Sequence, residues 1–156
     1  MKHVYLAGAI EYAPGGGREW RLTIGQFLRD EIGVRVFDPC QNEMDLLSPE
    51  EKVSFRRWKT EDHSRFAATV RKIIDHDLDN LMNHTQFVVC LWDKGCTRGA
   101  GTAGELTLAY HRRVPVYMVL AMPRSEVSSW ALACATEVFH SFDELKEFLR
   151  NAENHR

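Results

Sequence analysis

Residues 86–92 read QFVVCLW, and this run decides the fold class because it is apolar along nearly its whole length. A strand with one face in water alternates apolar and polar residues, whereas a strand of a parallel sheet is covered on both faces and stays apolar throughout. Four further runs rich in β-branched and aromatic residues share this character: 3–9 (HVYLAGA), 34–38 (VRVFD), 114–120 (VPVYMVL) and 137–140 (EVFH). The sequence therefore predicts five strands.

Helical patterns separate the predicted strands. Apolar residues recur at three- and four-residue spacing in five segments: 18–32, 64–83, 102–113, 128–135 and 142–152, the last with Ser141 as its N-cap. Strands that alternate with helices form a parallel sheet covered on both faces. We therefore expect an α/β protein, a flavodoxin-like three-layer sandwich with a five-stranded parallel sheet. The length of 156 residues fits a single domain, 1–156.

The composition argues against several classes of partner. A net charge of -2, with 44% apolar and 27% charged residues, gives no electrostatic reason to expect polymeric nucleic acid or an anionic membrane. The apolar start of the chain breaks into Glu11 and glycines and is too short for a signal peptide or a membrane span, which predicts a cytoplasmic protein. The four cysteines lack metal-site spacing, so we expect buried, reduced thiols and no metal.

Three connections between the predicted elements are long. Residues 8–19 (GAIEYAPGGGRE) follow the first strand, and 93–105 (DKGCTRGAGTAGE) follow the third. Ligands of such sheets bind at the carboxyl ends of the strands where the strand order reverses, which is between these two connections. The third connection, 40–62, is expected to act as a lid and to contain a short helix capped by Ser48, with Pro49 at its first position.

Residues 99–105, GAGTAGE, admit three interpretations. The G-x-G-x-x-G spacing matches a dinucleotide loop, but it follows the third strand and no acidic residue ends the next one, which disfavours NAD or FAD as cofactor. Thr102 and Glu105 also have the T-x-x-E spacing of a helix capping box. Alternatively, Glu105 is a catalytic carboxylate at a helix N-terminus that keeps it ionised at neutral pH. Capping and catalysis are compatible, and both stay open.

Asp77 interrupts the apolar stripe of the predicted helix 64–83. Its neighbours on that face are Val70, Ile73, Ile74, Leu78 and Leu81. An unpaired buried carboxylate costs several kcal/mol, so this position indicates a partner, a ligand or the rim of a pocket. The alternative is a carboxylate at the edge of the stripe, bonded to a backbone amide or an arginine.

Four pieces in chain order resemble the nucleoside 2-deoxyribosyltransferase family. They are 4–10 (VYLAGAI), 36–39 (VFDP), 75–81 (DHDLDNL) and 101–110 (GTAGELTLAY). A related group, the nucleoside 5'-monophosphate N-glycosidases, has a stretch similar to 16–19 (GGRE). The resemblance implies cleavage of an N-glycosidic bond without a cofactor, on a nucleoside or nucleotide substrate. It also implies a homodimer or larger homo-oligomer with shared active sites.

The same resemblance assigns roles to residues. Glu105 would attack the anomeric carbon as nucleophile, and Asp77 would hold a sugar hydroxyl and orient Glu105. Tyr5 and Gly8 would lie at the sugar, and Asp38 would lie near the base. The remaining residues expected to bind substrate are Ile10, Arg18, Asp93, Gly101, Thr102 and Ser129.

The chain departs from the family's pattern at three places. Many of these transferases have a carboxylate that handles the proton of the base six residues before the nucleophile, where this chain has Gly99, so that Asp93 or Asp38 would have to substitute. The segment expected to reach a neighbouring site offers 128–130 (SSW) in place of an asparagine. Glu11 stands where the nucleotide hydrolases grip phosphate, although Arg18 and the amides of 15–17 offer an anion site. A monophosphate hydrolase and a non-catalytic nucleotide-sensing module therefore remain alternatives.

Overall fold

A computed structural model describes residues 2–154 of the chain. Its centre is a five-stranded, all-parallel sheet in the order β2-β1-β3-β4-β5. This order confirms the flavodoxin-like fold, because the strand order reverses between β1 and β3 as that topology requires. The strands are β1 (His3–Gly8), β2 (Arg35–Phe37), β3 (Thr85–Trp92), β4 (Val116–Leu120) and β5 (Glu137–Phe139).

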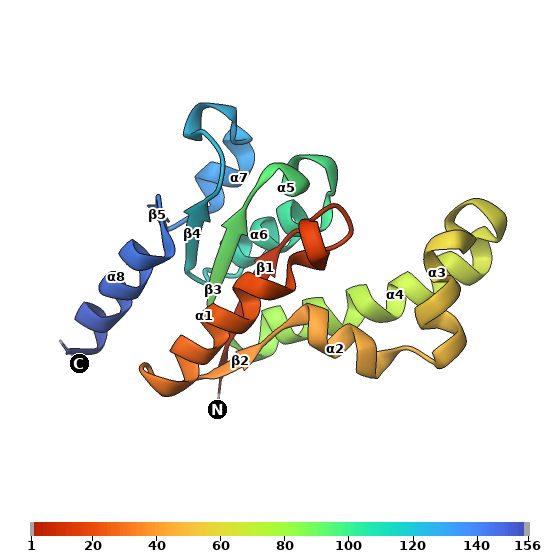
Figure 1. Cartoon of the computed structure of the whole chain (residues 1–156), viewed down its shortest axis with the longest axis horizontal. Coiled ribbons are helices and arrows are strands. Elements are labelled where there is room, and N and C mark those ends of the chain that lie inside the picture. Colours follow the sequence, from red (N-terminus) through yellow and green to blue (C-terminus); the bar gives the residue numbers. More distant parts are fainter. Residues whose placement is uncertain (1, 155–156) are drawn as a thin grey trace.

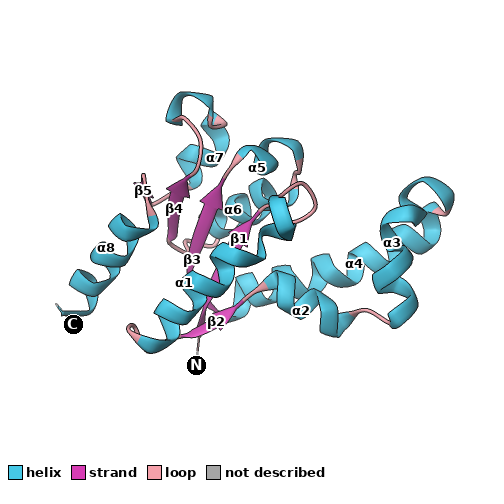
Figure 2. Ribbon diagram, viewed as in Figure 1, coloured by secondary structure: helices cyan, strands magenta, loops and turns pink. Residues whose placement is uncertain are grey.

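Helices cover both faces of this sheet, as Figures 1 and 2 show. The five predicted helices are present as α1 (Arg18–Asp30), α4 (His63–Asp79), α6 (Gly101–His111), α7 (Ser129–Cys134) and α8 (Phe142–Asn154). Side chains of α1 and α8 share one core with the sheet, and side chains of α6 and α7 share the other. Strand β3 is apolar throughout because both of its faces are buried. Val88 and Cys90 point into one core, and Phe87 and Val89 point into the other.

The long connection after β2 differs from the expectation of one short helix. It holds two helices, α2 (Pro39–Leu46) and α3 (Pro49–Glu61). Helix α2 begins where the Asp38 side chain accepts a hydrogen bond from the Cys40 amide, and the predicted Ser48 cap of α3 is confirmed as a complete capping box with Glu51. Helix α3 packs on the first half of α4, and the pair projects from the sheet as an arm (Figure 1).

Shorter helical segments complete the described chain. Helix α5 (Lys94–Arg98) follows β3, 3-10 turns lie at Pro14–Gly17 and Arg124–Glu126, and α4 continues into a π-helical turn at Asn80–His84. All four cysteines are buried free thiols, which confirms the expected burial. Within residues 2–154 no helix combines the length and apolar character needed to cross a bilayer.

Candidate active site

A cavity of about 530 Å³ opens at the carboxyl ends of β1 and β3. Its walls come from the loop after β1, the start of α6, the apolar face of α4 and the inner side of α2 and α3. Six residues predicted from the sequence line this one cavity: Gly8, Ile10, Asp77, Gly101, Thr102 and Glu105. The cavity therefore lies at the switch point of the strand order, where ligands of such sheets bind.

Glu105 does not cap its helix. Helix α6 begins at Gly101 with Ala100 as its N-cap, and no side chain bonds to the cap amides. Thr102 is therefore already inside the helix, and Glu105 lies in the second turn, so the expected capping box is wrong. The hydroxyl of Tyr5, within β1, donates a hydrogen bond of 2.7 Å to Oε1 of Glu105. This bond fixes one carboxylate oxygen from beneath the cavity.

The environment of Glu105 raises its pKa. Burial raises the pKa from 4.5 to about 7, while the Tyr5 hydrogen bond and the charge of Arg21 act in the lowering direction. The expectation that amide donors and the helix N-terminus keep Glu105 ionised at neutral pH is therefore met only in part, because a pKa of about 7 leaves the group partly ionised there. The reason is position, because a second-turn carboxylate is beyond the amides that make a helix start favourable to anions.

Asp77 faces Glu105 across the same cavity from α4. Its side chain is 14% exposed, and Nδ1 of His76 lies 3.8 Å from its Oδ1. The alternative of an arginine-paired edge position therefore does not hold. Burial, followed by the charges of Glu105 and Glu43, raises the pKa of Asp77 to about 7. Two carboxyl groups that repel each other in one cavity titrate as a pair near neutral pH.

Arg21 is a buried cation that the sequence argument did not single out. Its side chain is 1% exposed, Nη1 and Nη2 donate hydrogen bonds of 2.9 Å to the carbonyls of Gly17 and Gly8, and Nε lies 3.5 Å from Asp38 Oδ1. Its charge lowers the pKa of both Glu105 and Asp77. A signal existed, since Arg21 interrupts the apolar stripe of α1 as Asp77 interrupts that of α4.

Three predicted site residues lie away from the cavity. Asp38 caps α2 and faces Arg21, so it does not line the wall near a bound base. Ser129 is exposed at the start of α7 and likewise does not line the cavity. Asp93 caps α5 through the Cys96 amide and lines a separate cavity of about 380 Å³ on the α1 side.

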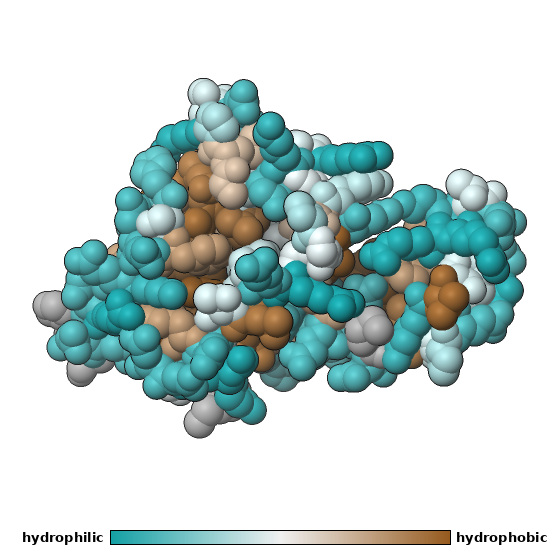
Figure 3. Space-filling model, in the orientation of Figure 1, coloured by the Kyte–Doolittle hydropathy of each residue, from teal (hydrophilic) through white to brown (hydrophobic). Residues whose placement is uncertain are grey.

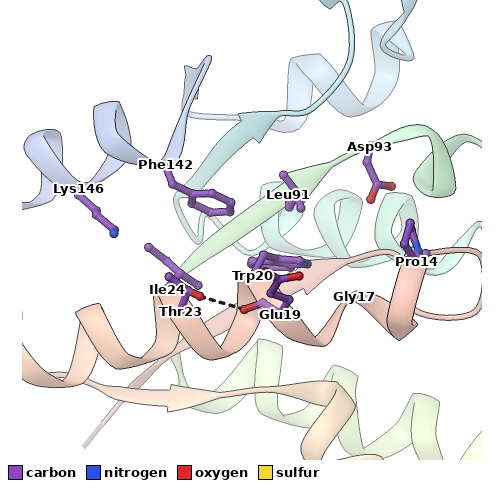
Figure 4. A pocket seen from close by; sticks show the side chains of 11 residues that line it. Pro14, Gly17, Glu19, Trp20, Thr23, Ile24, Leu91, Asp93, Phe142 and Lys146 are labelled. Carbon is purple, nitrogen blue, oxygen red and sulfur yellow. Dashed lines mark hydrogen bonds between the residues drawn. The ribbon is translucent and has the colours of Figure 1, made fainter.

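That separate cavity lies between α1 and α8. Figure 4 shows Asp93 at the end of β3, with Trp20 and Phe142 on the facing helices. The two rings stack with centroids 5.8 Å apart. On the face shown in Figure 3, apolar side chains gather between α8 and α1. Asp93 therefore lines a different cavity from Glu105, the group that it was expected to assist.

Arg18 lines a third cavity, of about 360 Å³, beside the first. Gly15 and Gly16 form one wall with φ of +58° and +68°, a left-handed turn that favours glycine. Arg56 also lines this cavity, so the predicted anion site contains two arginines. Glu11, at the rim of both cavities, is paired with Lys59 of α3.

The cysteine, histidine and carboxylate side chains of residues 2–154 are the candidate ligands of a metal site. Among residues 2–154 no group of three of them is arranged to hold an ion. Among the carboxyl groups that line the main cavity, Asp77 and Glu105 have pKa values near 7, and the Tyr5 hydroxyl and the buried Arg21 act on Glu105 from outside its lining. Such a set supports covalent catalysis by a carboxylate and proton transfer.

Two solved structures share this architecture. The 2-deoxyribosyltransferase from the psychrotolerant bacterium Bacillus psychrosaccharolyticus has a TM-score of 0.65 and 16% identity, over 92% of this chain and 90% of that chain. A conserved protein from Enterococcus faecalis V583 has a TM-score of 0.65 and 17% identity, over 97% of this chain and 99% of that chain. No protein-family model and no curated protein sequence matches the chain. The resemblance to 2-deoxyribosyltransferases therefore holds at the level of the fold.

Proposed function

We propose that this protein cleaves the N-glycosidic bond of deoxynucleosides through a covalent intermediate on Glu105 and transfers the sugar to a second base. One observation carries the proposal. Glu105 is held by Tyr5 at the switch point of the sheet, in the same cavity as Asp77, and without the capping role that would otherwise explain it. The fold shared with a 2-deoxyribosyltransferase supports the same reaction class.

The hydrogen bond from Tyr5 makes the two carboxylate oxygens of Glu105 inequivalent. Oε1 accepts the hydroxyl, so Oε2 is the oxygen left for attack on the anomeric carbon. As the Oε2–carbon bond forms, the carbon–nitrogen bond breaks through an oxocarbenium-like transition state and its electron pair leaves with the base. A second base or water then attacks the glycosyl ester and restores the carboxylate. A pKa of about 7 makes Glu105 more basic than an exposed carboxylate and still substantially ionised at neutral pH.

Asp77 is assigned to the sugar. Its carboxyl group lines the cavity opposite Glu105 and has no arginine partner within the described chain. A sugar hydroxyl that donates to Asp77 would satisfy this carboxylate and place the anomeric carbon near Glu105. In the shared cavity, Asp77 would thus hold the sugar while Glu105 attacks its anomeric carbon.

A second candidate is the hydrolysis of nucleoside 5'-monophosphates. The cavity that adjoins the main cavity contains Arg18 and Arg56, two side chains that can bind a phosphate, although Glu11 and Glu43 also line it. A nucleotide-sensing module of the same fold is the non-catalytic alternative. A cytoplasmic location stays a prediction. A homo-oligomer with shared active sites also stays a prediction, and light scattering of the purified protein would measure the oligomeric state.

The test is incubation of the protein with each deoxynucleoside or its 5'-monophosphate, plus a second base, followed by chromatography. Transfer predicts an exchanged nucleoside; hydrolysis of the monophosphate predicts free base only. Glu105→Gln should abolish either product, whereas Glu147→Gln, an exposed glutamate on α8, should retain it. Mass spectrometry of the quenched wild type should show a deoxyribosyl adduct. Tight binding that Glu105→Gln retains, with no adduct and no product, would establish the sensing module instead.

A further inference from the structure

The proposed reaction needs an acid for the departing base, because a nucleobase leaves far more readily when a ring nitrogen is protonated. The two substitutes expected from the sequence are not available. Asp38 is engaged by the Cys40 amide and faces Arg21, and Asp93 lines the cavity on the α1 side. The position six residues before Glu105 is glycine. The acid must therefore come from another wall of the cavity.

Glu43 on α2 is a carboxyl group with no structural task. It is half-buried and lines both the main cavity and the adjoining cavity that contains Arg18. No hydrogen bond or ion pair joins its carboxylate to another residue in the 2–154 range. It does not cap α2 either, because Asp38 does so. A half-buried carboxylate without a protein partner, in the wall of a cavity, is placed to contact a ligand.

The surroundings of Glu43 raise its pKa. Burial raises its pKa, and the charges of Arg56 from α3 and Arg18 from α1 lower it by less. Asp77, on the helix against which α2 packs, feels the charge of Glu43, so the two groups belong to one electrostatic unit. Cys40, on the same helix, has its own pKa raised mainly by burial. Glu43 thus keeps its proton to a higher pH than an exposed glutamate.

We propose that Glu43 is the general acid and base of this reaction; the inference rests on the function proposed above. In the first half, Glu105 bonds to the anomeric carbon, the carbon–nitrogen electron pair passes to the base, and the Glu43 proton moves to a base ring nitrogen. The base leaves neutral, and Glu43 becomes a carboxylate. In the second half, this carboxylate takes the proton of the incoming base or water as the latter attacks the anomeric carbon and releases Glu105.

The test uses a leaving group that needs no proton. The base of 7-methyl-2'-deoxyguanosine is already cationic and departs neutral, whereas that of 2'-deoxyguanosine requires an acid. We expect Glu43→Gln to lower kcat/KM for 2'-deoxyguanosine by about 10² to 10⁴, and for the methylated substrate by less than tenfold. For a pyrimidine-specific enzyme the pair is 2'-deoxyuridine and 5-fluoro-2'-deoxyuridine, because the fluorinated base leaves as a more stable anion and depends less on an acid. Retained activity on the activated substrate also shows that the variant is folded.

Two further variants separate the outcomes. Asp45→Asn, an exposed carboxylate on the same helix, should change neither substrate, and Glu105→Gln should lose both. An equal loss on both substrates in Glu43→Gln, or no loss on either, overturns the role of Glu43. The role of Glu43 is also overturned if Asp77→Asn, and not Glu43→Gln, loses activity on 2'-deoxyguanosine and retains it on the methylated substrate. If the wild type cleaves none of the four substrates, the proposed function itself fails.

Discussion

Replacement of Asp77 by asparagine is expected to stabilise the protein above neutral pH and to change its stability little at pH 4. Burial and the charges of Glu105 and Glu43 raise the pKa of Asp77 from 3.8 to about 7. The unfolded chain therefore loses this proton near pH 4, and the folded chain retains it to about pH 7. Between these values the folded state binds more protons, so the free energy of unfolding falls as the pH rises. The asparagine variant does not lose this stability, because its side chain does not titrate.

The magnitude follows from the size of the pKa shift. A rise of about 3 units corresponds to about 4 kcal/mol at pH 8, at about 1.36 kcal/mol per unit, as an upper limit. Water enters the cavity and Glu105 titrates together with Asp77, so the measured gain should be about 1 to 3 kcal/mol. The new amide also changes the free energy of unfolding by about 1 kcal/mol at every pH. The prediction is therefore tested by the growth of the gain with pH.

Urea denaturation of the wild type and two variants at pH 4, 6 and 8 measures the effect. Asp75→Asn is the matched control, since Asp75 is exposed on the same helix two residues away. The gain from Asp77→Asn should grow with pH, and that from the control should not. A gain that is the same at all three pH values, or one that the control reproduces, would refute the argument from burial and repulsion.

Three other substitutions test the supports of the site. Tyr5→Phe removes the hydrogen bond that lowers the pKa of Glu105, so the acid limb of the kcat/KM profile should move to higher pH, and kcat/KM should fall about tenfold, the equivalent of one hydrogen bond. Gly8→Ala brings a methyl group to 2.8 Å from Trp20 Cζ2 and should lower the free energy of unfolding in urea by about 1 to 3 kcal/mol. Arg21→Met removes the buried cation whose charge lowers the pKa of Glu105, so it should destabilise the protein in urea by about 3 to 5 kcal/mol and shift the acid limb of the pH profile upward.

The elements of the sheet could be predicted because their signals are local. Strand β3 is apolar on both faces, and α4 and α8 have the spacing of amphipathic helices. Helix α2 was missed because its eight residues, PCQNEMDL, have no apolar stripe. It forms through the Asp38 cap and proline at its first position, and then through packing on α4. Such a helix depends on contacts that a window of sequence does not contain.

The site was predictable only in part, for a related reason. Asp77 and Arg21 each place a charge in an apolar stripe, a signal visible in the sequence, although only the first was used. The partner of Glu105 is Tyr5, 100 positions away, and only the parallel pairing of β1 with β3 brings them together. Glu43 carries no local signal, because its entry into the cavity depends on how α2 packs against α4.

The failure of the capping box strengthens the case for catalysis. A glutamate that caps a helix gains hydrogen bonds from amides, which lowers its pKa and stabilises the fold. Glu105 and Asp77 have raised pKa values instead, so each destabilises the folded protein once it ionises. Arg21 and Tyr5 act on Glu105 in the opposite direction without cancelling the effect of burial. Two carboxyl groups that share one cavity and weaken the fold at neutral pH are consistent with the substrate site proposed above.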